Sequence, residues 1–124
     1  RRYQEVKKFE LVKLTGKTYY QKAMHLMANK IENPVFFCFT QDRKWAEENL
    51  DLSYKVIFID EKEGDKGAIE DHFLFRKCSN YIISNSTFYW WGAWLSEHKD
   101  KIVISPTNWV NTDSNPSEWI VLND

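Results

Sequence analysis

Two hydroxyl side chains stand directly ahead of a tryptophan-rich segment in this 124-residue chain. They are Ser86 and Thr87, within the sequence SNSTFYWWGAWL at residues 84–95. If a helix begins here, its first turn presents free backbone N–H groups and the positive end of the helix dipole. Together with the hydroxyls, these groups suit a phosphate or diphosphate. The alternative is an ordinary N-cap formed by Asn85 or Ser86, which adds about 1 kcal/mol to helix stability, and the two roles are compatible.

The carboxylate of Asp71 is the second candidate for chemistry, because it is expected to open the preceding helix. An acid there can simply interact with the helix dipole, or it can accept two N–H donors from the edge of a purine base. The sequence contains no Asp-x-Asp pair, no Gly-x-Gly-x-x-Gly or Walker loop, and no Gly-x-Ser-x-Gly elbow. The three histidines are too scattered for a zinc pattern, so no metal site is predicted.

The aromatic residues behind the hydroxyls fall on two faces of a helix. One face carries Phe88, Trp91 and Leu95, and the other carries Trp90 and Trp94. A helix that is apolar nearly all round is typically buried, so core packing is predicted for most of these rings. Stacking of one ring on a sugar is the alternative. The small residues Gly92 and Ala93 allow a neighbouring backbone to approach closely.

Apolar periodicity places helices and strands in alternation along the chain. Helices are predicted at residues 18–31, 42–49, 68–77 and 87–97, and strands at 34–40, 55–60, 81–84 and 101–105, with a short closing element at 119–122. Asp42 is expected at the start of the second helix as a cap or first-turn acid, and Pro106 is expected to stop the fourth strand. The third helix is expected to turn Ile69 and Phe73 inward, together with Phe75.

These strands are apolar on both faces and alternate with helices, which indicates a parallel sheet covered on two sides. The predicted fold is therefore α/β, a Rossmann-like parallel sheet with helices on both faces, in one domain over residues 1–124. In such sheets ligands bind outside the carboxyl ends of the strands, where the next helix begins. The segment from Ser84 to Thr87 occupies such a position.

The composition limits the classes of partner that the chain is expected to bind. The formal net charge of −1 gives no global field that attracts nucleic acid or acidic lipid. No apolar run approaches the roughly 18 residues of a membrane span. Cys38 and Cys78 are expected to be buried, reduced thiols.

One stretch of the sequence resembles a known protein family, which the spacing of residues alone does not indicate. IEDHFLFRKCSNYIISNSTFYWWGAWL, at residues 69–95, resembles the C-terminal signature of glycosyltransferase family 11, the α-1,2-fucosyltransferases. Here Ser84 replaces the family's alanine and Tyr89 its serine. KIVISPTNW at residues 101–109 and TYYQKAM at residues 18–24 are similar to two further family segments.

The resemblance implies the C-terminal, donor-binding half of a GT-B-like enzyme that uses GDP-fucose. Such an enzyme would transfer fucose to the 2-hydroxyl of a galactose-containing glycan, with inversion and with neither metal nor other cofactor. Carried over position by position, the residues from Asn85 to Phe88 would bind the donor, with Ser86, Thr87 and Phe88 holding the diphosphate. Asp71 would read the guanine edge.

The family's first motif, His-x-Arg-Arg-Gly-Asp, matches only in part. Arg1 and Arg2 are either the remnant of its catalytic arginines or an accidental start, and residues 1–17 are either a frayed remnant of that segment or unrelated to it. The acceptor-binding half is absent, so the fragment is not expected to turn over alone. Its exposed sheet edge would favour self-association.

Three hypotheses about the function of the chain follow. The first is a fucosyltransferase donor domain, the second a transferase for another nucleotide sugar, and the third a non-enzymatic carbohydrate- or partner-binding α/β module. The compartment is left open: the cytoplasm, with or without membrane association, in a bacterium, or the Golgi lumen in a eukaryote.

Overall fold

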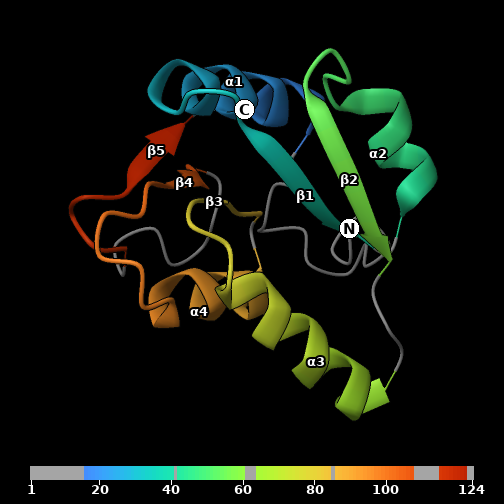
Figure 1. The fold of residues 1–124 in the computed structure, drawn as a ribbon, viewed down its shortest axis with the longest axis vertical. Coiled ribbons are helices and arrows are strands. Elements are labelled where there is room, and N and C mark those ends of the chain that lie inside the picture. The colour runs from blue at the N-terminus through green and yellow to red at the C-terminus, as the bar shows by residue number, and fades with distance from the viewer. Residues whose placement is uncertain (1–15, 41, 61–63, 85, 108–114, 123–124) are drawn as a thin grey trace.

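The computed structural model describes residues 16–40, 42–60, 64–84, 86–107 and 115–122. Its elements are α1 (Lys17–Lys30), β1 (Val35–Thr40), α2 (Arg43–Asn49), β2 (Lys55–Asp60), α3 (Gly64–Arg76), β3 (Tyr81–Ile82), α4 (Thr87–Leu95), β4 (Val103–Pro106) and β5 (Ile120–Leu122). Figure 1 shows the strands between two helical layers, with α1 and α2 at the top of the view and α3 and α4 at the bottom. The predicted α/β class, with helices on both sides of parallel strands, is confirmed.

Every strand pair among the described residues is parallel, but the strands form two sheets where the sequence predicted one. β1 pairs with β2, from Val35 opposite Lys55 to Thr40 opposite Asp60. β4 pairs with β3 on one side and with β5 on the other. Between β1 and β3 there is a cleft in place of a hydrogen-bonded ladder.

The helix α1 covers one face of the three-stranded sheet, because its buried residues recur every four positions. Tyr19, Ala23 and Met27 form this stripe and pack with Ile104 of β4. The Tyr19 side chain is fully buried, and its hydroxyl lies 2.6 Å from the carbonyl oxygen of Ile83 and 3.0 Å from that of Ile104. The start of α1 is therefore fixed over the carboxyl ends of β3 and β4.

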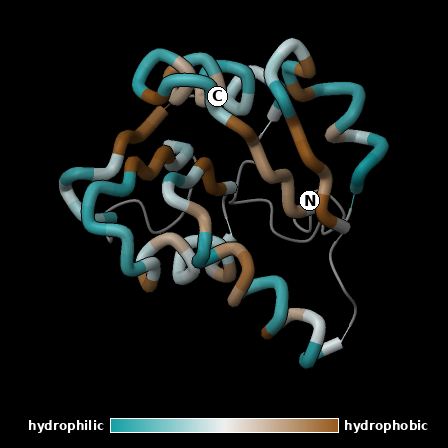
Figure 2. Tube along the Cα trace, viewed as in Figure 1, coloured by the Kyte–Doolittle hydropathy of each residue, from teal (hydrophilic) through white to brown (hydrophobic). Residues whose placement is uncertain are grey.

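The helices α3 and α4 cover the opposite face, where the main core lies. Its buried residues are Phe75, Tyr81, Ile83, Trp90, Ala93, Val103 and Trp119. Side chains alternate between the two faces of a strand, so Tyr81 and Ile83 point to this core while Ile82 points to α1. Figure 2 shows the corresponding hydropathy, with hydrophobic residues along the strands and alternating stretches on the helices.

The predicted inward face of the third helix is wrong for Ile69 and Phe73 and right for Phe75. Ile69 and Phe73 are 70% and 55% exposed, whereas Asp71 and Phe75 are 3% and 7% exposed. The helix also begins at Gly64, so Asp71 lies in its interior instead of opening it. Because Asp71 and Phe75 are four residues apart, they share the buried stripe. Ile69 and Phe73 are left on the solvent side.

The prediction that most rings of the tryptophan-rich helix are core residues is only partly right. Trp90 is 9% exposed and belongs to the core, but Trp91 and Trp94 are 50% and 48% exposed. The reason is that α4 packs against the sheet and α3 on one side only.

The structure also bears on the predictions for Asp42 and Pro106. Asp42 caps α2 by accepting a hydrogen bond from the Trp45 N–H at 3.1 Å, as predicted, whereas β4 extends through Pro106.

Candidate functional site

The candidate site lies where the chain passes from β3 into α4. This is a carboxyl end of the three-stranded parallel sheet, the edge at which ligands of open α/β folds bind. Ser86 occupies the N-cap position of α4, with extended backbone angles (φ −131°, ψ 128°). The N–H groups of the first turn of α4 therefore begin immediately after this residue.

Ser86 occupies the capping position without making the capping bond. Its carbonyl oxygen accepts the first helical hydrogen bond from the Trp90 N–H at 3.0 Å, but its side chain makes no cap hydrogen bond. The side chain is buried, with 5% of its surface exposed. Capping of α4 by Ser86 is thus not observed, and Asn85, the other capping candidate, lies outside the described residues.

The middle of α3 lies directly against the first turn of α4. His72 Nε2 is 3.1 Å from the Phe88 carbonyl oxygen, and because a carbonyl can only accept, the imidazole donates. The two rings meet edge to face, with centroids 4.8 Å apart. Burial lowers the pKa of His72, and the Arg76 guanidinium lowers it further. The neutral ring is therefore favoured, and a neutral ring still supplies the N–H that this contact needs.

Gly92 allows this close contact between the two helices. A Cβ atom at this position would lie 2.6 and 2.9 Å from two ring carbons of Phe75, and 3.4 Å from His72 Nε2. The first two distances are shorter than any ordinary carbon contact. Gly92 is closely approached, but by the Phe75 ring and not by the neighbouring backbone that the small residues of this helix predicted.

Asp71 lies next to His72 in the chain, within α3. At 3% exposure it is one of the most buried polar residues that the structure describes. Burial of a carboxylate is costly unless it has partners, so a surface-exposed dipole interaction is not its role. The buried position agrees with a carboxylate built into the fold.

Two contacts hold α4 in place behind the corner. Trp90 Nε1 donates to Asn115 Oδ1 at 2.7 Å, and Asn115 Nδ2 donates to Ser105 Oγ of β4 at 3.1 Å. At the other end, Lys101 Nζ donates to the carbonyl oxygens of residues 93, 94 and 96, at 2.7, 3.2 and 2.9 Å. A cation at the carboxyl end of a helix is favourable, so both ends of α4 are fixed to the sheet side of the fold.

The structure places the predicted site residues on two neighbouring helices. Asp71 is buried in α3, Ser86 directly precedes α4, and Thr87 and Phe88 are the first two residues of α4, where His72 of α3 contacts the Phe88 carbonyl. Arg1 and Arg2 lie outside the described residues, as does Asn85. Sequence reasoning missed His72, although a signal existed: the four-residue spacing of Gly67, Asp71 and Phe75 would have put His72 beside the buried stripe.

Other kinds of site are not observed in the described part of the chain. Its His, Cys, Asp and Glu residues nowhere form a group of three or more that could hold a metal ion. None of its helices combines the length and the apolar character needed to cross a membrane. Cys38 and Cys78 are free and half-buried, and burial raises the pKa of the Cys78 thiol.

Comparison with known proteins gives consistent matches. Residues 3–123 match glycosyl transferase family 11. The chain is 42% identical over 91 residues to the O-antigen biosynthesis glycosyltransferase WbnK of Escherichia coli, covering 73% of this chain and 30% of the relative. It is 32% identical over 133 residues to an alpha-1,2-colitosyltransferase of Escherichia coli, covering 97% of this chain and 44% of the relative.

More distant relatives come from animals. Galactoside alpha-(1,2)-fucosyltransferase 1 of Rattus norvegicus is 32% identical over 82 residues, which cover 64% of this chain and 21% of that protein. The chain thus spans less than half the length of each of these three relatives. No solved structure matches it significantly.

Proposed function

This chain belongs to glycosyl transferase family 11, and on that premise we propose that it is the donor-binding part of a glycosyltransferase that uses a nucleotide sugar. The observation that carries the proposal is the corner between β3 and α4, where Ser86 stands at the head of the helix without capping it. Backbone N–H groups, a helix dipole and a hydroxyl together suit a diphosphate. The corner also lies at the sheet edge where α/β folds bind nucleotides.

The finer proposal is GDP-fucose as donor and the 2-hydroxyl of a galactose-containing glycan as acceptor. The names of the relatives support an α-1,2 linkage, since they include a colitosyltransferase and a galactoside fucosyltransferase. Because those names cover two different sugars, a second nucleotide sugar is the competing donor. A screen of nucleotide sugars with the intact enzyme decides between them.

The proposed reaction proceeds with inversion and without a metal ion. The acceptor hydroxyl attacks the anomeric carbon of fucose from the face opposite GDP and gives its proton to a base. The bond from that carbon to the β-phosphate oxygen breaks, the carbon becomes oxocarbenium-like, and negative charge grows on the β-phosphate of the departing GDP. Donors already aimed at that oxygen stabilise the charge without reorganisation. Ser86 and the N–H groups at the start of α4 would supply part of this stabilisation. The acceptor, and the groups that activate it, would be held by the other half of a GT-B-like enzyme. An arginine would complete the stabilisation of the diphosphate charge, and Arg1 and Arg2 are its candidates.

Replacing Ser86 by alanine tests the corner. We expect about a ten-fold weaker affinity for GDP, because one hydrogen bond to a charged group is worth roughly 1.5 kcal/mol. Stability should change little, because the side chain makes no capping bond. Calorimetric titration with GDP gives the affinity, and urea unfolding gives the stability. If instead the free energy of unfolding falls by about 1 kcal/mol while the affinity for GDP is unchanged, Ser86 is a cap and the corner is not the diphosphate site.

A non-enzymatic carbohydrate-binding module is the second candidate, and one observation favours it. Trp91 and Trp94 are about half exposed, with ring centroids 5.6 Å apart, and exposed aromatic faces can stack on sugars. This candidate predicts that Trp91→Ala or Trp94→Ala removes binding to a panel of galactose-containing glycans. Titration of the same variants with GDP separates the two functions, because the donor-site proposal expects GDP affinity to persist in both.

A further inference from the structure

The outer face of the helical layer formed by α3 and α4 exposes large apolar side chains. Five of them, 44–70% exposed and outside the cleft between β1 and β3, form what we call the outer patch: Ile69, Phe73, Trp91, Trp94 and Leu95. In the part of the chain that the structure describes, α1 and α2 on the other side of the strands contribute no exposed large apolar residue. Large exposed apolar patches usually mark a surface that binds a partner.

The outer patch points away from the sheet on both helices. In α3 the core residue Phe75 and the exposed Phe73 are two positions apart, which puts them on nearly opposite sides of the helix. In α4 the core residue Ala93 and the exposed Leu95 are related in the same way. The Phe75 ring packs against Gly92, so the two helices form one layer, at the bottom of Figure 1.

The tryptophan rings of α4 form a continuous aromatic surface. The ring centroids of Trp90 and Trp91 are 4.9 Å apart, and those of Trp91 and Trp94 are 5.6 Å apart. Trp90 is a core residue, so Trp91 rests on a ring that is fixed in the fold. Tryptophan combines an apolar body with one N–H donor, and such side chains are enriched where a membrane meets water.

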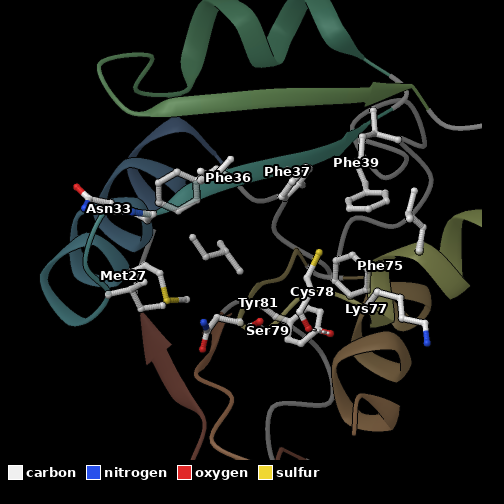
Figure 3. A pocket seen from close by; sticks show the side chains of 17 residues that line it. Met27, Asn33, Phe36, Phe37, Phe39, Phe75, Lys77, Cys78, Ser79 and Tyr81 are labelled. Carbon is white, nitrogen blue, oxygen red and sulfur yellow. Dashed lines mark hydrogen bonds between the residues drawn. The ribbon is translucent and has the colours of Figure 1, made fainter. Parts of the chain in front are cut away.

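Two cations pack on the aromatic ring that α3 adds to the patch. Lys77 Nζ lies 4.8 Å from the centroid of the Phe73 ring, and Arg76 Cζ lies 5.9 Å from it. Neither cation forms a salt bridge with another residue that the structure describes, and Arg76 Nε is buried without a hydrogen-bond partner there. Figure 3 shows the amine of Lys77 directed away from Phe75 and the cleft. Their positive charge is therefore available to an anionic partner.

The charges around the patch favour an anionic surface over a second copy of the chain. The sequence has no acid from residue 72 to residue 96, and Asp71, which precedes this segment, is buried. In a symmetric pair the same surface would meet itself, so Arg76 and Lys77 of one copy would face the cations of the other. The net charge of −1 gives no long-range attraction to acidic lipid, so binding depends on this local charge and on the aromatic rings.

We propose that the outer patch docks on an anionic lipid bilayer. Phe73, Trp91 and Leu95 would lie at the boundary between headgroups and acyl chains. Arg76 and Lys77 would bind lipid phosphates, to which guanidinium and ammonium groups donate charge-assisted hydrogen bonds. Their apolar stems would stay on the protein surface while the charged ends reach the headgroups. Helices that carry aromatic residues beside basic ones bind membrane surfaces in this way.

Docking of the outer patch would hold the corner between β3 and α4 beside the membrane. Ser86 directly precedes α4, and Trp91 follows it by five residues, which is about 8 Å along a helix axis. The donor site would therefore lie within reach of acceptors attached to the same bilayer. This consequence rests on the proposed function, whereas the docking itself does not.

Binding of the full-length protein to lipid vesicles tests the proposal. Vesicles of phosphatidylcholine alone are compared, by sedimentation, with vesicles of phosphatidylcholine and phosphatidylglycerol in equal parts. We expect at least about ten-fold tighter binding to the anionic vesicles, weakened by added salt. Lys77→Glu should reduce this binding by about thirty-fold, because it changes the local charge by two. Lys44→Glu makes the same change in α2, on the opposite layer, and should alter it by less than about three-fold.

Binding to neither kind of vesicle would reject the proposal. So would an equal loss of binding in Lys77→Glu and Lys44→Glu, because overall charge and not the patch would then control the affinity.

Serine substitutions test the apolar part of the patch. Phe73→Ser and Trp91→Ser should each weaken binding to the anionic vesicles by at least about ten-fold. Leu52→Ser is the control and should leave binding unchanged, because Leu52 is also half exposed but lies between α2 and β2. Urea unfolding checks that the variants fold, and if Trp91→Ser does not, Phe73→Ser and Lys77→Glu decide.

A different result from the serine variants would assign the surface to protein. If they bind vesicles as the unaltered protein does, or change only the oligomeric state seen by size-exclusion chromatography, another polypeptide covers the patch and the proposal fails. The vesicles contain neither nucleotide nor glycan, so failure here leaves the proposed function intact.

Discussion

Replacing Gly92 by alanine is expected to destabilise the chain by about 1–2 kcal/mol. The new methyl group would lie 2.6 Å from a ring carbon of Phe75, which is itself buried and cannot swing aside. Overpacking of this kind costs about 1–3 kcal/mol, and the better helix propensity of alanine offsets up to about 1 kcal/mol. Urea unfolding of the two proteins measures the difference. Because α4 would move away from α3, GDP affinity should fall as well.

The double variant Gly92→Ala, Phe75→Leu provides the matched control. Leucine keeps a Cδ2 atom but lacks Cε2 and the rigid ring, so its side chain can turn away from the methyl group. The pair should therefore be less destabilised than the sum of the two single changes by roughly 1 kcal/mol. Additive effects would mean that the Phe75 ring does not limit the approach of α4. Unchanged stability on Gly92→Ala alone would contradict the close contact itself.

Replacing Asp71 by asparagine is expected to weaken GDP binding by about 100-fold. In the proposed donor site the carboxylate accepts two N–H donors of guanine, and such charge-assisted, two-point contacts are worth roughly twice a neutral hydrogen bond. Asparagine has nearly the same shape but turns one acceptor into a donor. Calorimetric titration of both proteins with GDP gives the ratio of affinities.

Inosine diphosphate distinguishes base recognition from a structural role for Asp71. It lacks the exocyclic amine of guanine, so the unaltered chain should prefer GDP, and Asp71→Asn should lose that preference. Asp71 is buried, so the substitution can also lower stability, which unfolding of the ligand-free proteins would reveal. If GDP and inosine diphosphate weaken equally and stability falls, Asp71 supports the fold and does not read the base.

Most elements of the fold could be predicted from local sequence. Continuous apolar runs marked β1 and β2, and the alternation with helices indicated parallel strands. The corner after β3 was found for the same reason, because small polar residues separate an apolar run from a helix at the edge where such folds bind ligands. Asp42 also acts as the cap that its position suggested.

The sequence by itself thus determined the order, type and parallel direction of the elements and the position of the polar corner, since these follow from local chemistry and period. Tertiary structure decided which side of each helix is buried. Ile69 and Phe73 are as apolar as Phe75, yet α3 buries the stripe of Asp71 and Phe75, and it is the Phe75 ring that packs closely against Gly92 of α4. The tertiary structure also leaves Trp91 and Trp94 half exposed and contains the cleft beside β3. A periodic pattern specifies how often a residue faces the core, but the direction of that core depends on partners far away in the chain.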